Sequence, residues 1–182
     1  ARAELVAFVD ADMVLRPDAL TRLVEVLDAH PELRGANGTV SLDLDADLDP
    51  LDAVTDFVNA SLHWQLSRHG DRVASAFTAI CVFRRSALEE MDGWDEQWFS
   101  RYADDVATRF VLPPRSLAFV GEAQGAHLKT VPLRGLLKHR FNIGYFFVAS
   151  LAENRGETRA DNAVLDLRYP LNTAAALATG GL

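Results

Sequence analysis

The sequence has little cysteine, few basic residues and no long apolar run, and each shortage excludes a class of protein. One cysteine among 182 residues, Cys81, excludes an intramolecular disulfide and a multi-cysteine zinc site, and it suits a reducing compartment. The 18 basic and 26 acidic side chains give a net charge of −8, which argues against a nucleic-acid-binding protein. The longest apolar candidate, residues 141–152, is shorter than the ~20 residues of a membrane-spanning helix, and no signal peptide is predicted.

The composition predicts one folded domain. Apolar residues make up 49% of the chain, which lets a domain of this size bury roughly two-thirds of its unfolded surface. The apolar pattern is clear up to about residue 152 and weak over residues 153–182. Residue 1 is Ala rather than Met, and a strand-like run begins within a few residues of it. We therefore expect further sequence to precede residue 1.

Strand-like and helix-like segments alternate along the chain. The expected strands are residues 5–9, 35–42, 72–83 (with a break near Thr78) and 117–120. The expected helices run from Pro17 to His30, from Leu51 to Leu62, from a capping Ser86 to Gly93, and over residues 132–151. Such alternation predicts an α/β layered fold with a largely parallel sheet.

Two aspartates follow the first predicted strand. Asp10 and Asp12 are separated by one residue, so in an extended chain their side chains point the same way. Ligands of open α/β sheets bind beyond the carboxyl ends of the strands, and Mg²⁺ or Mn²⁺ prefers oxygen ligands. Two aspartates that simply begin a turn would give the same pattern. The motif alone does not decide between these interpretations.

Two later features gain meaning only in combination with these aspartates. The pair Asp104-Asp105 lies near an expected helix start, where acidic residues are favoured by the helix dipole in any case. His127 follows a predicted strand, and a lone histidine is more often a packed or surface residue than a ligand. It supports a metal site only if it lies near Asp12.

The order of these features resembles the family 2 glycosyltransferases of the GT-A fold. Their pattern is an aspartate-x-aspartate, a phe-arg-arg-x-ala-leu helix closing in gly-gly-phe-asp-glu, an acidic pair followed by arginine, and a late histidine. In this chain residues 82–96 read VFRRSALEEMDGWDE. The resemblance covers residues 4 to about 145, with Asp104 in place of the usual Glu and Asp92 in place of the first glycine. It implies a mixed, mostly parallel sheet flanked by helices, lacking the family's N-terminal nucleotide-binding part.

The resemblance also implies roles for single residues. Asp10, Asp12 and His127 would hold Mn²⁺ or Mg²⁺, and Arg140 would contact the donor diphosphate. Asp105 would be the general base, with Asp104 positioning the acceptor or supporting Asp105. The residues expected on the acceptor side are Thr78, Trp94 and Asp95. Residues 1–152 would then be the metal- and acceptor-binding portion of the catalytic domain, and residues 153–182 a C-terminal extension.

The implied reaction moves a sugar from a UDP-, GDP- or dTDP-linked donor to an acceptor hydroxyl, with inversion at the anomeric carbon. A glycosidase needs a second carboxylic acid for its leaving group, whereas a cation can stabilise a departing diphosphate directly, so one base suffices. The acceptor would be a glycan, a lipid-linked glycan or a peptide, as in bacterial cell-envelope polysaccharide synthesis. The location would be cytoplasmic, with peripheral contact on the inner face of the cell membrane. Residues 132–151 could make that contact or could dock against the sheet.

Two other interpretations fit parts of the sequence. A haloacid-dehalogenase-like phosphatase would use Asp10 as nucleophile and Asp12 as acid/base, with Asp104-Asp105 binding Mg²⁺. Residues 98–102, before that acidic pair, lack the apolar strand that such a phosphatase has there. The non-enzyme alternative is an inactive or scaffold fragment without turnover.

Overall fold

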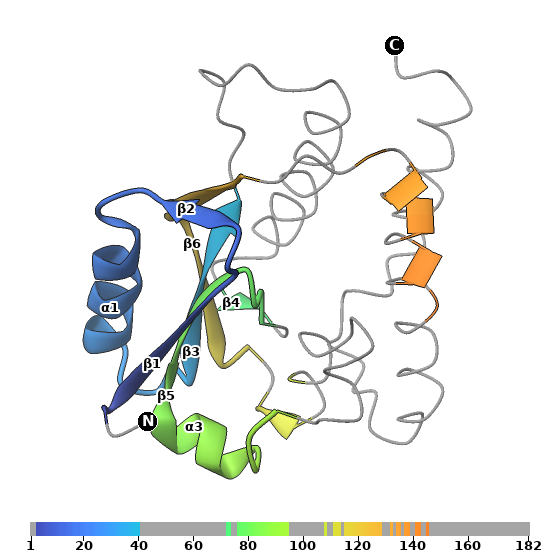
Figure 1. The fold of residues 1–182 in the computed structure, drawn as a ribbon. Coiled ribbons are helices and arrows are strands. Elements are labelled where there is room, and N and C mark those ends of the chain that lie inside the picture. The colour runs from blue at the N-terminus through green and yellow to red at the C-terminus, as the bar shows by residue number, and fades with distance from the viewer. Residues whose placement is uncertain are drawn as a thin grey trace.

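The structure is a computed structural model and contains a six-stranded mixed sheet with helices packed against it (Figure 1). It describes residues 3–40, 72–73, 76–94, 108, 111–113, 115–128, 132, 134, 135, 137, 138, 141, 142 and 145. The strands are β1 (Leu5–Val9), β2 (Met13–Leu15), β3 (Gly35–Val40), β4 (Arg72–Val73), β5 (Ile80–Arg84) and β6 (Leu117–His127). The helices whose first and last residues are both described are α1 (Ala19–Ala29) and α3 (Arg85–Glu90).

The strand order is β1-β5-β3-β6-β2, with β4 also paired to β6. The mixed α/β class is as predicted, but the expectation of a mostly parallel sheet is wrong for the described strands. Of their five pairings, only β3 with β6 is parallel. The physical reason is that β5 inserts between β1 and β3, antiparallel to both. Alternation along the sequence does not show that a later strand will enter between earlier ones.

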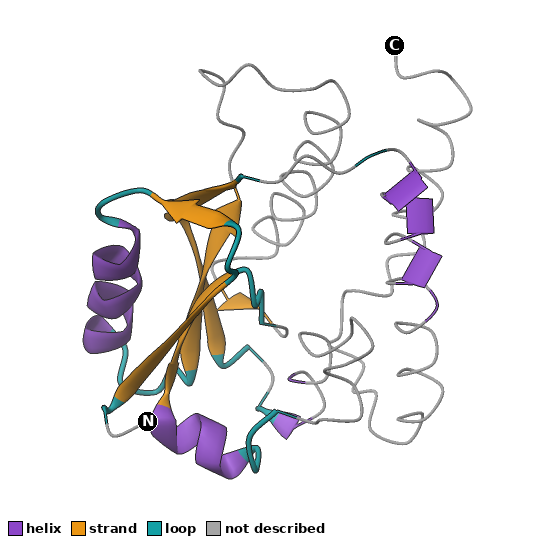
Figure 2. Cartoon of the chain, in the orientation of Figure 1, coloured by secondary structure: helices purple, strands orange, loops and turns teal. Residues whose placement is uncertain are grey.

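The directions of the strands nevertheless bring two carboxyl ends to one edge. Because β5 is antiparallel to β1 and to β3, those two strands run the same way, and β6 is parallel to β3. The chain leaves β1 at Val9 and leaves β6 at His127, so both strands end at the same edge of the sheet. Figure 2 shows β2 at this edge, beside the end of β6.

The core lies on both faces of the sheet. Ile80 and Val82 of β5 pack in the cluster that contains α1, whereas Cys81 and Phe83 pack in a second cluster on the other face. This alternation explains why β5 is apolar at four successive positions, as expected of a strand covered on both faces. An apolar run does not by itself show such cover, because β1 is also wholly apolar but is an edge strand of the described sheet and has only half-buried and exposed residues.

Helix α1 confirms the predicted helix between Pro17 and His30. Its buried residues are Ala19, Leu23 and Leu27, whereas Leu20 is 38% exposed. Arg84 of β5 holds the end of the helix, because its guanidinium donates to the carbonyl oxygens of Leu27 at 2.6 Å and Leu33 at 2.9 Å.

The residue before α1 makes an ion pair rather than a side-chain cap. Arg22 Nε donates to Asp18 Oδ2 at 2.7 Å, and this hydrogen bond lowers the pKa of the exposed Asp18 carboxyl. Both side chains are about half exposed. The pair is therefore a solvated surface contact, and such pairs contribute little to stability.

Two expectations about later elements need correction. Helix α3 begins at Arg85 with Arg84 at its N-cap and no side-chain cap, so Ser86 lies inside the helix and does not cap it. The short strand predicted at residues 117–120 is instead the 11-residue β6, which includes His127. Strand β2 was not predicted. The break near Thr78 is confirmed as a turn between β4 and β5.

Several expected elements lie outside the described residues. They include the helix over residues 51–62, the helix start expected near Asp104-Asp105 and the extension 153–182. The long helix expected over residues 132–151 is described at residues 134, 135, 137, 138, 141, 142 and 145, all of which are helical. Within the described part of the chain, no helix has the length and hydrophobicity to cross a membrane.

Candidate metal site

Three potential metal ligands meet at the edge where β1 and β6 end. They are Asp10, Asp12 and His127. Each offers one ligand atom, and these three atoms lie within 4.8 Å of one another. Asp10 is exposed, while Asp12 and His127 are half-buried. The sequence placed these residues in one site only through a family resemblance. The structure confirms that they are neighbours.

A tight turn positions the two aspartates. Strand β1 ends at Val9, and the amide N–H of Met13 donates to the Asp10 carbonyl oxygen at 3.0 Å. The Asp10 amide N–H donates to the carbonyl oxygen of Ala79 at 3.2 Å. The backbone of Asp10 is therefore fixed from both sides, by its own turn and by the turn that precedes β5.

The unpredicted strand β2 brings Asp12 to His127. Met13 is directly opposite His127 in the antiparallel β2–β6 pair, and the Leu128 N–H donates to the Asp12 carbonyl oxygen at 2.7 Å. Cα atoms directly opposite each other in such a pair are ~4.5–5.5 Å apart. The residue just before β2 and the last residue of β6 must therefore be neighbours.

The donor set fits a divalent cation of intermediate hardness. Carboxylate oxygens suit Mg²⁺ and Mn²⁺, and an imidazole nitrogen in the set favours a transition metal such as Mn²⁺ over Mg²⁺. With metal–ligand distances of about 2.1 Å, neighbouring octahedral ligand atoms lie ~3.0 Å apart and opposite ones ~4.2 Å apart. The three ligand atoms already lie within 4.8 Å of one another, so at most a small side-chain movement would let all three bind one cation.

The turn that contacts Asp10 is itself held by buried polar side chains. The Phe77 N–H donates to Asn37 Oδ1 at 3.0 Å, and the Ala76 N–H donates to Thr108 Oγ1 at 2.9 Å. Both Asn37 and Thr108 are fully buried. Thr78, expected on the acceptor side, belongs to this turn and is half-buried. The turn thus connects strand β3 and residue 108 to the backbone of the metal site.

Neither Asn37 nor Thr108 was predicted to support the site. A signal was present at Asn37, since asparagine is uncommon inside a strand and this one is flanked by small residues in GANGTV. For Thr108 the sequence offers no such signal.

Trp94, the second described residue expected on the acceptor side, lies in an aromatic cluster. Its ring packs edge-on against Phe8 at a centroid distance of 5.3 Å and against Phe83 at 5.8 Å. The chain reaches it through Asp92 and Gly93, which have φ angles of 55° and 80°. Glycine suits this conformation, and aspartate tolerates it better than most residues. Trp94 is half-buried and follows the turn at the end of α3.

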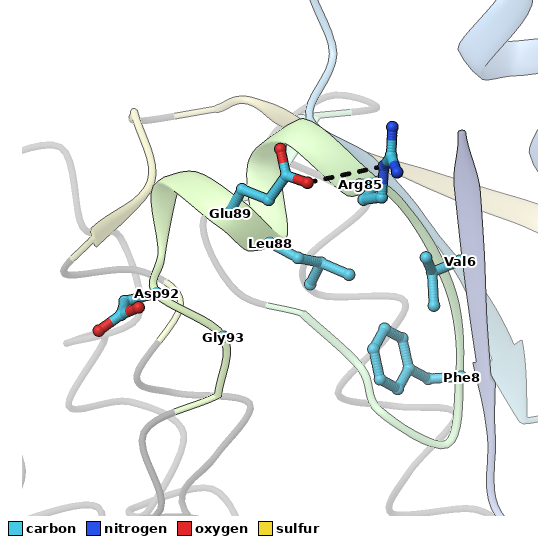
Figure 3. A pocket seen from close by; sticks show the side chains of 7 residues that line it. All are labelled: Val6, Phe8, Arg85, Leu88, Glu89, Asp92 and Gly93. Carbon is cyan, nitrogen blue, oxygen red and sulfur yellow. Dashed lines mark ion pairs between the residues drawn. The ribbon is translucent and has the colours of Figure 1, made fainter. Parts of the chain in front are cut away.

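A pocket of about 550 Å³ lies between β1 and α3 (Figure 3). Its lining residues are Val6, Phe8, Arg85, Leu88, Glu89, Asp92 and Gly93. Arg85 and Glu89 pair with each other at 3.6 Å, and none of the three candidate metal ligands lines the pocket. Phe8 connects it to Trp94, because that side chain both lines the pocket and packs against the tryptophan.

Four expected site residues lie outside the described part of the chain. They are Asp95, Asp104, Asp105 and Arg140. Their roles therefore stay predictions.

A mixed α/β sheet with an Asp-Ala-Asp turn at the carboxyl end of a strand is the arrangement that the GT-A resemblance predicts. The chain is similar to the mannosyltransferase PcManGT from Pyrobaculum calidifontis, solved in complex with GDP-Man and Mn²⁺. The TM-score is 0.61 and the sequence identity 21%, and the match covers 100% of this chain and 52% of that one. The chain thus spans about half the length of that enzyme, and at this identity the likeness shows the fold.

The sequence profile described as glycosyltransferase like family 2 matches residues 1–120, and the chain belongs to that family. The comparison with curated proteins gave no match. The predicted family and the GT-A fold are confirmed. Family membership decides against the phosphatase alternative.

Proposed function

We propose that this protein transfers a sugar from a nucleoside-diphosphate sugar to an acceptor hydroxyl, using a divalent cation held by Asp10, Asp12 and His127. The observation that supports it most is the convergence of these three side chains within 4.8 Å at one edge of the sheet. In open α/β sheets that edge is where ligands bind. Membership in the glycosyltransferase family and the Mn²⁺ in the similar mannosyltransferase support the same proposal.

The residues of this site would act mainly by binding and orientation. When bound, the cation would neutralise charge that develops on the departing diphosphate. Asp12 and His127 would hold it from neighbouring strands, and the fixed backbone of Asp10 would keep the third ligand in place. Arg140 would add a positive charge beside the diphosphate.

The acceptor would be activated by a single base, and the sugar would invert its anomeric configuration. We propose Asp105 as this base, with Asp104 orienting the acceptor. Support comes from their position between the segment ending in Gly93-Trp94-Asp95-Glu96 and Arg109. A positioned base contributes about 10²–10⁴-fold in rate. Thr78, Trp94 and Asp95 would line the acceptor side.

The donor and the location are also proposals. The GDP-Man of the similar mannosyltransferase makes GDP the first nucleotide to test, followed by UDP and dTDP. The acceptor would be a glycan, a lipid-linked glycan or a peptide, and the proposed setting is bacterial cell-envelope polysaccharide synthesis. The reaction would take place in the cytoplasm, at the inner face of the cell membrane.

The test is a titration with Mn²⁺ and GDP, UDP or dTDP, followed by thermal unfolding and calorimetry. It uses both this chain and the product of the complete reading frame, because the similar enzyme is about twice as long. We expect metal plus nucleotide to raise the melting temperature, and Asp12→Ala and His127→Ala to remove the metal effect. Arg22→Gln, a substitution on the exposed side of α1, is the matched control. No stabilisation of the complete product by any metal–nucleotide pair would refute the proposal and favour a scaffold without turnover.

A further inference from the structure

A helical segment late in the described chain carries an exposed apolar stripe. Leu137, Phe141 and Tyr145 are spaced four residues apart, so their side chains follow one face of the helix. Their exposed fractions are 61%, 72% and 61%, and the rings of Phe141 and Tyr145 are stacked at a centroid distance of 6.4 Å. A helix of a soluble domain normally turns such a stripe towards the core. Here it faces outward.

Two basic side chains border the stripe. Arg134 and Lys138 are exposed, and at 3.6 residues per turn they fall within the same arc of roughly 100° as the three apolar residues. The two other described residues of the helix, Gly135 and Asn142, lie outside that arc and are less exposed. The outward face is therefore apolar and basic together.

The charge of this face is opposite in sign to the net charge of the chain. The chain carries a net charge of −8, so a face whose two described charged groups are both basic selects an anionic partner. The surface of an anionic bilayer meets both requirements. Aromatic and aliphatic side chains enter the boundary between headgroups and acyl chains, while long basic side chains reach the phosphates.

We propose that the face formed by Arg134, Leu137, Lys138, Phe141 and Tyr145 binds an anionic phospholipid bilayer, with the helix lying in the plane of the interface. In Figure 1 the described residues of this helix lie on the opposite side of the molecule from α1. A bilayer bound there leaves α1 in solvent, and α1 provides internal controls.

The test measures co-sedimentation of the full chain with vesicles of phosphatidylcholine alone or mixed with phosphatidylglycerol. We expect binding only to the anionic vesicles, weakening as salt is added. Each basic residue near such a surface contributes about fivefold, so Arg134→Gln combined with Lys138→Gln should weaken binding roughly 25-fold. Leu137→Ala combined with Phe141→Ala should abolish it, since alanine removes the apolar side chains and keeps helix propensity. Leu20→Ala, which shortens an exposed leucine on α1, should bind as the parent protein does.

A second measurement does not depend on the stability of the alanine variants. The native cysteine, Cys81, is fully buried, so Phe141→Cys offers an exposed thiol for a polarity-sensitive fluorophore. We expect its emission to shift to the blue with anionic vesicles, whereas the same label at Leu20→Cys should not shift. Equal responses at both positions, or no vesicle binding by the parent protein, would overturn the proposal.

A second copy of the chain is the competing occupant of this face. Sedimentation velocity without vesicles that shows a dimer, lost on changing Leu137 and Phe141 to alanine, would overturn the membrane proposal. The proposal is independent of sugar transfer, because Asp12→Ala should bind vesicles like the parent protein. A failure of vesicle binding and a failure of the metal–nucleotide titration are therefore separate results.

Discussion

Replacing Gly125 with alanine tests whether the close packing of β2 on β6 holds Asp12 beside His127. Gly125 lies two residues before His127 and directly opposite Leu15 of β2. A Cβ atom at this position would lie 2.6 Å from the end of the Met13 side chain and 2.9 Å from the end of the Leu15 side chain. Both distances are shorter than real Cβ atoms show, so something must move.

The size of the effect follows from what can move. The end of the Met13 side chain can rotate away, but the Val14 carbonyl oxygen, 3.2 Å from the new Cβ, belongs to the backbone of β2. Overpacking of this kind costs about 1–3 kcal/mol of folding free energy. Asp12 precedes β2 and moves with it. Because lost support for metal ligands lowers affinity about 10–100-fold, we expect Mn²⁺ binding at the lower end of that range, near 10-fold weaker.

The assay is calorimetric titration of Mn²⁺, with thermal unfolding measured on the same samples. Gly121→Ala is the matched control on the same strand, because its Cβ would meet only Phe119, at an ordinary 3.6 Å. We expect the control to keep both its melting temperature and its Mn²⁺ affinity. If Gly125→Ala unfolds at a lower temperature and still binds Mn²⁺ as tightly as the parent protein, the packing of β2 does not place Asp12, and the reasoning fails.

Three further substitutions test separate parts of the structure. Asp105→Asn should lower sugar transfer at least ~10²-fold in the complete protein with metal–nucleotide binding unchanged, and retained activity would remove the base assignment. Thr108→Val leaves the Ala76 amide without its acceptor and should cost about 1–3 kcal/mol in urea unfolding, whereas Thr108→Ser should restore most of it. Arg84→Met removes one guanidinium hydrogen bond to the last turn of α1 and one to the segment that follows it, and should cost a similar ~1–3 kcal/mol. An unchanged urea midpoint would count against that role.

The parts of the fold that were predictable from the sequence are those with a strong local pattern. β1 has the bounds expected from its apolar run, and α1 lies between Pro17 and His30 because helix periodicity and the proline positions agree. Strand β5 begins at Ile80, just after the break that the residue pattern predicts near Thr78. These features depend on neighbours in the chain, and local physical chemistry is enough to specify them.

Strand direction could not be read in the same way. A continuous apolar run indicates a strand covered on both faces, and β5 shows that such a strand can be antiparallel to both of its neighbours. The side-chain pattern reports burial, whereas direction depends on which strands insert between which. The burial argument also fails at β1, where Val9 is 40% exposed although the run is wholly apolar.

The metal site shows most clearly what a local pattern leaves out. The spacing of Asp10 and Asp12 indicates two carboxylates on one side, but their meeting with His127 depends on β2, a strand of three residues. That length is too short for any periodicity to identify. A sequence signal for it does exist in its partner, because a glycine inside a strand often marks the close approach of another chain segment. Gly125 is such a residue, and the space it leaves is taken by Met13 and Leu15. The geometry of the cation site therefore rests on the absence of a side chain at Gly125 as much as on the three side chains that would bind the metal.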